Sequence, residues 1–404
     1  MKLLAAFFCI LTLFSCAHTN APSVQQNLLT ETWMQNINLN PVKWTRGASR
    51  WFFTGEPATT ENYVNLAPND KAMTFSAVKV PQFTHVLLNG CFQVQILGGQ
   101  NRNSVVVLGP NDATRQVMVR VEGNTIIVTQ AHDDKGQMAN LKNVIVRIGV
   151  CNLRGLKIAG NVNMEGRNLT SDGLVISSTN SGNVLLSGNV NLLKINHMGT
   201  GTISVLGVYA PCLDINMRGS GRVDVSGRVG IRSINNMSGK VHIIGADSKF
   251  LTVNAYGPSL TTVAGYVNLK QLNVCDNSCV YIFWAKSNGA RIVLRGNARV
   301  GLAGVVSAMD LTLAENARFG GQYLHGGKIY VLTRNNAHAN ISSNQKIFAS
   351  ASDNSSIYFF GISSNVSSYT SGLGSVVPVW RESVALPVPR YAPQFITVAK
   401  RPAG

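Results

Sequence analysis

The stretch GSGRVDVSG, residues 219–227, shows the pattern that decides the fold of this chain. Small residues are followed by a cation, then by two apolar residues that flank a polar one, and the unit closes on a small residue. The same order recurs in SGKVHIIG at residues 238–245 and in NARVGLAG at residues 297–304. Eleven such units end between Gly166 and Gly361, and (361 − 166)/10 gives a mean period of 19.5 residues. A period of this length predicts a solenoid of stacked repeats.

The apolar positions alternate with polar ones, as the two sides of a β-strand require. One column reads Val162, Val184, Ile203, Val223, Val241, Thr261, Tyr281, Val300, Phe319, Ala339 and Ile357. Two residues later comes Met164, Leu186, Val205, Val225, Ile243, Val263, Phe283, Leu302, Gly321, Ile341 and Phe359. The position between them holds Asn163, Ser204, Asp224, His242, Thr262 and Asn340, with Leu185, Ile282 and Tyr358 as apolar exceptions. We expect the two columns to face the core and the position between them to face out.

A turn precedes this strand in every unit. It carries a small residue, and before that a Ser, Thr, Pro or Asn, which in four successive units is Asn297, Asn316, Asn336 and Asn354. Small residues and short polar side chains mark turns, and stacked asparagines can hydrogen-bond from one strand to the next. We expect these four side chains to form a ladder along the turn.

A unit of about 20 residues cannot bury its apolar face alone, so neighbouring units must stack and pair their strands in parallel. Parallel crossovers are right-handed by default. The predicted fold is therefore all-β: a single-stranded, right-handed parallel β-helix of about 11 regular coils, preceded by irregular opening coils. A Gly-rich antiparallel sandwich or a propeller is the alternative, although a propeller needs units of about 40 residues.

The chain begins with Lys2, an apolar run and Ser15, which together are typical of a secretory signal over residues 1–15. Leu13-Phe14-Ser15-Cys16 resembles a bacterial lipobox, in which the cysteine is acylated. This resemblance implies a lipid anchor on Cys16 and an outer-membrane lipoprotein, facing either the periplasm or the surface. Cleavage after Ala17 is the alternative, and it would give a secreted or periplasmic protein.

Four segments follow from this organisation. The signal, residues 1–15, is followed by a linker or cap over residues 16–80, which holds three of the five Trp residues. The β-helix domain is expected over residues 81–363. Residues 364–404 form a Pro-containing basic tail.

Five cysteines remain after Cys16: Cys91, Cys151, Cys212, Cys275 and Cys279. An odd number in an exported chain excludes a fully paired disulfide scaffold. Cys275 and Cys279 flank a short turn and could form a bridge, but two free thiols fit the sequence equally well. No Cys-x-x-Cys and no cluster of histidines is present, so we expect no metal and no cofactor.

The opening of the repeat region has a recognisable order. Its apolar and small residues are Phe83, Val86, Gly90, Phe92, Val94 and Ile96, and Gly-Ser-Gly coils follow. Over about residues 80–361 this order resembles the bacterial family named putative auto-transporter adhesin, head GIN domain. The resemblance implies an exported or lipid-anchored β-helix that acts in adhesion or at the envelope.

An enzyme is the competing interpretation, because β-helices commonly host polysaccharide lyases and hydrolases. Hydrolysis needs two carboxylates roughly 5–10 Å apart, and a lyase would need a calcium-binding cluster of acids. The acids of the coils are scattered over different columns: Glu165, Asp172, Asp214, Asp224, Asp247, Asp276, Asp310, Glu315 and Asp353. We therefore predict no catalytic residues and a non-enzymatic binding module, with a carbohydrate-active enzyme as the alternative.

Charge is the best functional clue. The chain has 35 Lys and Arg against 18 Asp and Glu, a net charge of +17. The position before the first inward column carries Arg222, Lys240, Arg299 and Arg318, and Arg218 is close in sequence. Aligned cations on a rigid face attract polyanions, so the predicted partners are lipopolysaccharide, acidic polysaccharide or cell-surface glycans of a host. Nucleic acid is not predicted, because no aromatic stacking platform accompanies these columns, and the oligomeric state stays open.

Overall fold

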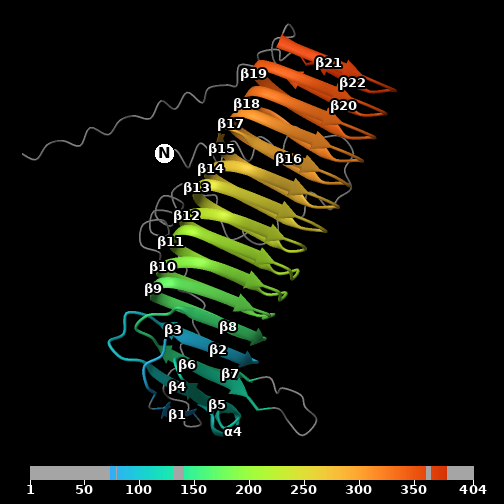
Figure 1. Ribbon diagram of the computed structural model, residues 1–404. Coiled ribbons are helices and arrows are strands. Elements are labelled where there is room, and N and C mark those ends of the chain that lie inside the picture. The colour runs from blue at the N-terminus through green and yellow to red at the C-terminus, as the bar shows by residue number, and fades with distance from the viewer. Residues whose placement is uncertain (1–72, 79, 132–140, 361–364, 380–404) are drawn as a thin grey trace, which may run out of the picture.

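The computed structural model describes residues 73–379 except residues 79, 132–140 and 361–364. Over this part the chain is a parallel β-solenoid of about 12 turns, which confirms the predicted fold class. The coils stack along one axis, with the opening strands at one end and β22 at the other (Figure 1). The strands of the regular coils are β8 (Gly155–Gly160), β9 (Asn163–Ser178), β10 (Asn183–His197), β11 (Thr202–Met217), β12 (Arg222–Asn236), β13 (Lys240–Ala255), β14 (Leu260–Val274), β15 (Cys279–Ser287), β16 (Ala290–Leu294), β17 (Arg299–Leu313), β18 (Arg318–Thr333), β19 (His338–Ala351), β20 (Ser356–Phe360), β21 (Val366–Thr370) and β22 (Ser375–Pro378).

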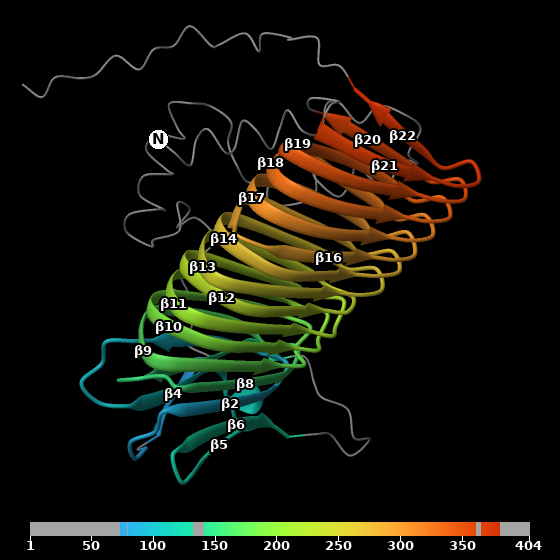
Figure 2. The ribbon, with the colours of Figure 1, turned by 45° about the horizontal axis from the view of Figure 1, so that its top comes forward.

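Most coils consist of one long strand whose register is interrupted at two places, the first of them a bend made by a glycine. The bend residues Gly188, Gly227, Gly265 and Gly304 have φ between 135° and 145°, a conformation that residues with a side chain rarely adopt. After the bend the strand returns along the other side of the coil, and a short turn leads to the next coil (Figure 2). We call the outward side chains before the bend, such as Arg222, the first face, and those near the strand end, such as Asn235, the second face.

The core follows the predicted columns. Val223 on β12 pairs in register with Ile203 on β11 and Val241 on β13, and all three side chains are at most 1% exposed. Polar residues predicted to face out, such as Asp224 and His242, are register partners on the first face. Each added coil thus buries the apolar side of the previous one, which a single coil could not do.

The prediction fails by one residue in the coil that contains β15. Tyr281 pairs with Thr262 and faces out, whereas Ile282 pairs with Val263 and is completely buried, the reverse of the expected assignment. The chain makes its bend here at Trp284, whose φ of 64° replaces that of the usual glycine. Because a strand alternates with period two, a one-residue error exchanges the two sides. The missing bend glycine is the reason that alignment on small closing residues misplaced this coil.

The predicted asparagine ladder is present and is one residue longer than expected. Side-chain amide Nδ2 groups donate to the Oδ1 of the preceding coil, at 3.1 Å from Asn316 to Asn297, 3.4 Å from Asn336 to Asn316 and 3.1 Å from Asn354 to Asn336. The additional member is Asn277, which accepts a bond of 2.9 Å from Asn297. Asn277 holds the ladder position that the sequence alignment assigns to Ser278, because the predicted alignment of this coil is wrong by one residue.

A second asparagine ladder, which we did not predict, runs along the second face. Asn196, Asn216, Asn235, Asn254 and Asn273 are register partners on β10 to β14 and are linked by amide hydrogen bonds of 2.8–3.0 Å. These asparagines recur about every 19 residues along the chain, at a fixed position before the turn. This spacing could have revealed the ladder from the sequence. Together the two ladders stiffen successive halves of the solenoid.

The opening segment is more than a set of irregular coils. Its elements are β1 (Met73–Val78), β2 (His85–Gly90), β3 (Phe92–Leu97), β4 (Ser104–Pro110), α4 (Asn111–Thr114), β5 (Val117–Glu122), β6 (Thr125–Gln130) and β7 (Leu141–Gly149). β2 pairs in parallel with both β6 and β8, so the first coil along the chain lies between the second and third in space (Figure 1). β1 pairs antiparallel with β4, β4 with β7, and β5 with β6. β1 and β5 therefore end the sheet at this end of the solenoid.

The C-terminal end of the solenoid extends further than predicted. β21 and β22 pair in parallel with β19 and β20, so regular structure continues past the expected domain end at residue 363.

All five cysteines among the described residues are free, including Cys275 and Cys279. None of the described helices has the length and apolarity to cross a bilayer. The signal, Cys16 and most of the 16–80 segment lie outside the described residues.

Candidate functional site

The predicted cations form two separate pairs on the first face. Arg222 pairs in register with Lys240, and Arg299 with Arg318. Leu260 and Cys279 occupy the two positions between the pairs, so the column is not a continuous basic stripe. Arg218 lies in the turn after β11, where its backbone N–H donates to the carbonyl of His197 at 2.9 Å. The structure therefore brings four of the five predicted residues into two clusters and leaves Arg218 at the edge.

The first of these pairs is partly neutralised. Arg222 Nε donates to both carboxylate oxygens of Asp224, at 2.7 and 2.8 Å, and both side chains are about one-quarter exposed (21% and 26%). Burial raises the pKa of Asp224, while Arg222 opposes this effect. Because the two charges offset each other, Arg222 attracts an external anion less strongly than an unpaired cation would.

His242 on the first face makes folding sensitive to acid. Burial, together with Arg222 and Lys240, lowers its pKa from 6.5 to about 3. Below pH 6.5 the unfolded chain takes up a proton that the folded chain does not, so stability falls as the pH drops toward 3. At pH 5 we expect a loss of about 1–2 kcal/mol relative to pH 7.5. His242→Gln should flatten this part of a curve of thermal midpoint against pH, and the exposed His325→Gln should not; parallel curves for all three proteins would contradict the assignment.

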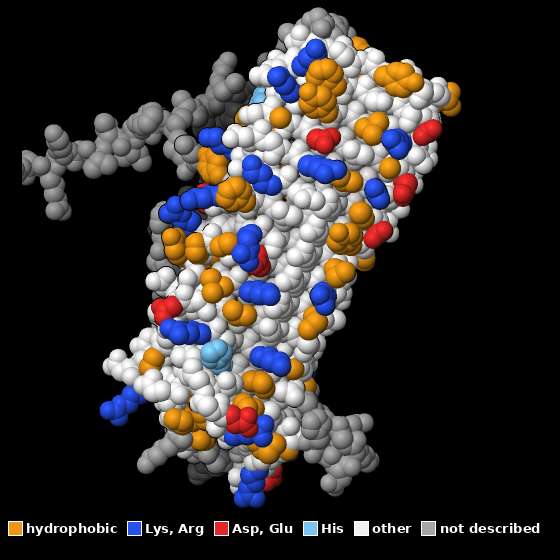
Figure 3. Space-filling view, viewed as in Figure 1, with side chains coloured by type: hydrophobic (Ala, Val, Ile, Leu, Met, Phe, Trp, Pro, Cys, Tyr) orange, Lys and Arg blue, Asp and Glu red, His pale blue; other side chains and the backbone are white. Residues whose placement is uncertain are grey.

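A second set of cations, which we did not predict, lies on the second face. From β10 to β19 it consists of Lys194, Arg232, Lys270, Arg291, Lys328 and Lys346, against the acids Asp214 and Asp310. Asp214 is bonded to Arg232, and this contact lowers the pKa of Asp214. Within the described residues Lys270, Arg291, Lys328 and Lys346 form no ion pair. Basic side chains accordingly outnumber acidic ones on the side seen in Figure 3.

Aromatic rings accompany these cations. Tyr330 on β18 and Phe348 on β19 are register partners and stack with ring centroids 4.7 Å apart and planes 4° from parallel. Lys346 Nζ lies 4.8 Å from the centre of the Phe348 ring, and Lys270 Nζ lies 5.9 Å from that of Phe250. Apolar and basic side chains gather near the C-terminal end of the solenoid in Figure 3. The alternation of the buried Ile329 and Val331 could have shown that their neighbours face out.

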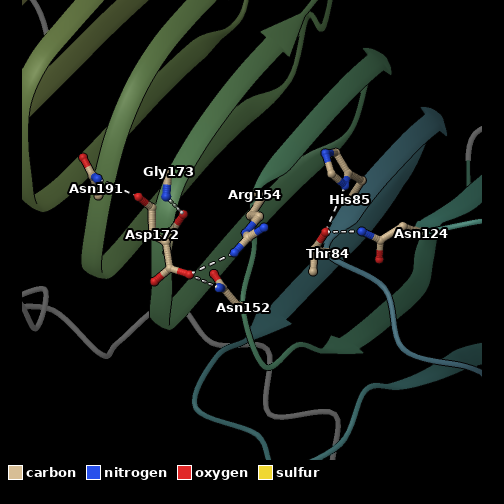
Figure 4. A network of polar contacts seen from close by, with 9 residues as sticks. Thr84, His85, Asn124, Asn152, Arg154, Asp172, Gly173 and Asn191 are labelled. Atoms are coloured by element: carbon tan, nitrogen blue, oxygen red, sulfur yellow. Dashed lines mark hydrogen bonds and ion pairs between the residues drawn. The ribbon is translucent and has the colours of Figure 1, made fainter.

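The carboxylates of the coils are mostly engaged in structural contacts. Asp172 accepts from Asn152 Nδ2 at 2.6 Å and from Arg154 at 3.3 Å, and the Asp172 backbone carbonyl accepts from Asn191 Nδ2 at 2.6 Å (Figure 4). Asp247 likewise forms an ion pair with Arg228 at 3.2 Å. These contacts hold one coil to the next.

Two further groups of residues could form a catalytic or binding site. Thr84 Oγ1 lies 3.0 Å from His85 Nδ1, but it accepts from the Asn124 amide at 2.7 Å, and no carboxylate of the described residues bonds to the histidine (Figure 4). A cavity of about 130 Å³ is lined by Cys91, Phe92, Gln93, Lys142, Asn161 and Asn163, none of them acidic. No group of three potential metal ligands occurs within the described residues.

Comparison with known proteins finds a matching family and similar solved structures. The solved structures that resemble this chain include a putative adhesin from Bacteroides fragilis (14% identity, 76% of this chain and 98% of that chain, TM-score 0.24) and a putative lipid binding protein from Parabacteroides distasonis (12%, 77%, 98%, 0.24). A putative adhesin from Parabacteroides merdae is similar at 11% identity, over 77% of this chain and 98% of that chain, with a TM-score of 0.23. No curated protein matches the sequence. Residues 82–270 match the family described as "Putative auto-transporter adhesin, head GIN domain", which confirms the family resemblance predicted from the sequence.

Proposed function

We propose that the protein is a non-enzymatic binding module of the cell envelope, and that its second face binds anionic ligands. The observation that carries the proposal is the register pair Lys328 and Lys346, two exposed lysines on adjacent coils. Their spacing is about one strand separation, ~4.8 Å. Like charges directly opposite each other destabilise a sheet, and within the described residues no acid pairs with either of them. An external anion would relieve this repulsion.

The rigidity of the sheet favours binding of extended polyanions. Cations on a solenoid keep their spacing because each strand is bonded to its neighbours along the backbone. Preorganised cations bind with less loss of conformational entropy than cations on flexible loops. Lipopolysaccharide phosphates and acidic or host-cell glycans are therefore the partner classes we propose, and neither a metal nor a cofactor is required.

The proposed location is the envelope. The family description refers to an adhesin, which acts outside the cytoplasm. The signal-like residues 1–15 and the lipobox-like Cys16 support export and an outer-membrane lipid anchor. An anchor at this end would leave the solenoid free to present its second face to ligands.

The test compares two double variants, each of which removes two positive charges. Lys328→Gln/Lys346→Gln removes the second-face pair, and Arg299→Gln/Arg318→Gln removes the matched first-face pair. With the full protein, binding to immobilised polyphosphate should weaken about tenfold in the first variant, a loss of about 1.4 kcal/mol, and should become less salt-sensitive. The second variant should bind nearly as the wild type does. A larger loss in the Arg variant would move the site to the first face.

The alternative function is a carbohydrate-active enzyme, a polysaccharide lyase or hydrolase. It is favoured by the solenoid architecture alone, because Asp172, Asp214 and Asp247 are held in contacts between coils and Asp224 is paired with Arg222. Product detection by mass spectrometry after incubation with a polysaccharide panel separates the two functions. Release of any oligosaccharide that is lost with an acid-to-amide variant would replace the binding module with an enzyme.

A further inference from the structure

The outward side chains at the ends of β18 and β19 form a compact grid on the second face. β18 contributes Lys328, Tyr330 and Leu332, and β19 contributes Lys346, Phe348 and Ser350. They are register partners in three successive rows. One row is basic, the next is aromatic and the third is apolar and polar. We call these six side chains the terminal station.

The aromatic row presents an apolar surface beside a charged one. Tyr330 is 50% exposed, although its ring stacks on Phe348. The stack holds both rings in one orientation, so they offer a preformed surface whose ordering costs little on binding. Lys346 Nζ lies only 4.8 Å from the Phe348 ring centre, so a ligand that reaches the rings also reaches a cation. The ligand must therefore combine an apolar face and an anionic group within a few ångströms.

A second place on the same face repeats this chemistry. Phe250 on β13 is 62% exposed, and Lys270 on β14 places its Nζ 5.9 Å from the ring centre. Arg291 and Asp310, register partners on β16 and β17, lie between this place and the terminal station along the solenoid axis. Five strand spacings separate β13 from β19, which is about 24 Å. A ligand that uses both places must be a polymer that lies along the axis.

We propose that the terminal station binds an acidic polysaccharide, with Phe250 and Lys270 as a second contact along the same chain. A uronic acid residue has a C–H face that packs on an aromatic ring and a carboxylate that pairs with lysine. Inorganic phosphate and lipid phosphate groups would use the lysines and leave the rings without a role. The inference rests on the proposed function, because it assigns the ligand class of the same basic face.

The test uses the full protein and four probes, one of which is a phosphatidylglycerol vesicle. Polygalacturonate carries sugar rings and carboxylates, its methyl ester keeps the rings without the charge, and polyphosphate carries charge without sugar rings. Tyr330→Ala/Phe348→Ala removes the aromatic row. Tyr209→Ala/Tyr266→Ala is the matched control, because it removes two exposed tyrosines from the bend, away from the station. Thermal unfolding of each variant shows whether it is folded.

We expect the aromatic variant to bind polygalacturonate at least about tenfold more weakly than wild type and to bind polyphosphate unchanged. The control variant should bind both as wild type does, and the methyl ester should bind weakly to all. If the double alanine variant does not fold, Phe348→Leu keeps apolar bulk in the strand and still removes the planar ring, with the same expected direction of change.

The test distinguishes a failure of this inference from a failure of the proposed function. If the aromatic variant keeps its affinity for polygalacturonate while Lys328→Gln/Lys346→Gln loses affinity for both polymers, the rings only pack the sheet and this inference is wrong, but the proposed function stands. If neither variant changes any affinity, both are wrong. Ring-dependent binding of phosphatidylglycerol vesicles without binding of polygalacturonate would assign a lipid surface instead and overturn the inference.

Discussion

Replacing Val223 with aspartate is expected to unfold the solenoid. The Val223 side chain is completely buried between Ile203 and Val241, with which it pairs in register. A carboxylate placed there would lose its hydration and gain no partner, because the adjacent core positions are aliphatic. Buried unpaired charges are among the few single changes that destabilise by more than about 4 kcal/mol.

The measurement is unfolding in urea followed by circular dichroism, with Thr202→Asp as the control. Thr202 faces outward on the neighbouring strand and pairs in register with Arg222, so a carboxylate there stays hydrated beside a cation. We expect its unfolding midpoint to stay close to that of the wild type. If both variants have the wild-type midpoint, Val223 does not lie in the core and the column assignment is wrong.

Gly304→Ala should destabilise the protein by about 2–4 kcal/mol. Gly304 makes the bend of its coil with a φ of 135°, and a Cβ atom there would meet the backbone carbonyl oxygen of Ala285 on the preceding coil. Both the dihedral angle and the close approach exclude a side chain. Since the contact is to backbone that is bonded on both sides, the neighbouring coil cannot move away cheaply.

Gly320→Ala is the matched control for this prediction. A Cβ at Gly320 would lie 3.4 Å from the side-chain oxygen of Gln322 and 3.6 Å from the carbonyl oxygen of Val300. These are ordinary contact distances, and the position does not require positive φ, so we expect a change below about 1 kcal/mol. Similar unfolding midpoints for the two variants would show that the bend tolerates a side chain and would contradict its proposed geometry.

Repetition is the reason that so much of the fold could be predicted. Each column of the repeat is sampled about eleven times, so a single irregular residue does not hide the alternation of Val223, Asp224 and Val225. The same averaging does not protect an individual irregular coil from an error in register: Val184 pairs with Met164 rather than with the expected Val162. At Trp284 the bend residue departs from the glycine of other coils, and no neighbouring signal compensates for it.

The binding faces were harder to predict because they depend on contacts between coils. The cation at Arg222 is visible in the sequence, but its neutralisation depends on Asp224 and on partial burial. Lys328 and Tyr330 stand in the last part of a long strand, where register shifts such as that between Gly326 and Lys328 interrupt the period. Their neighbours Lys346 and Phe348 follow 18 residues later rather than 19 or 20, so the columns drift out of alignment.

The sequence by itself determined the parallel solenoid, the inward columns and four members of the turn ladder, because these depend on local alternation and on a regular period. The tertiary structure decided the insertion of β2 between β6 and β8, the bend at Trp284 and the stacked rings of Tyr330 and Phe348. Strand order and ring stacking are relations between segments that are distant along the chain. They are set by which coil lies beside which, and a repeat that is read one unit at a time does not contain that information.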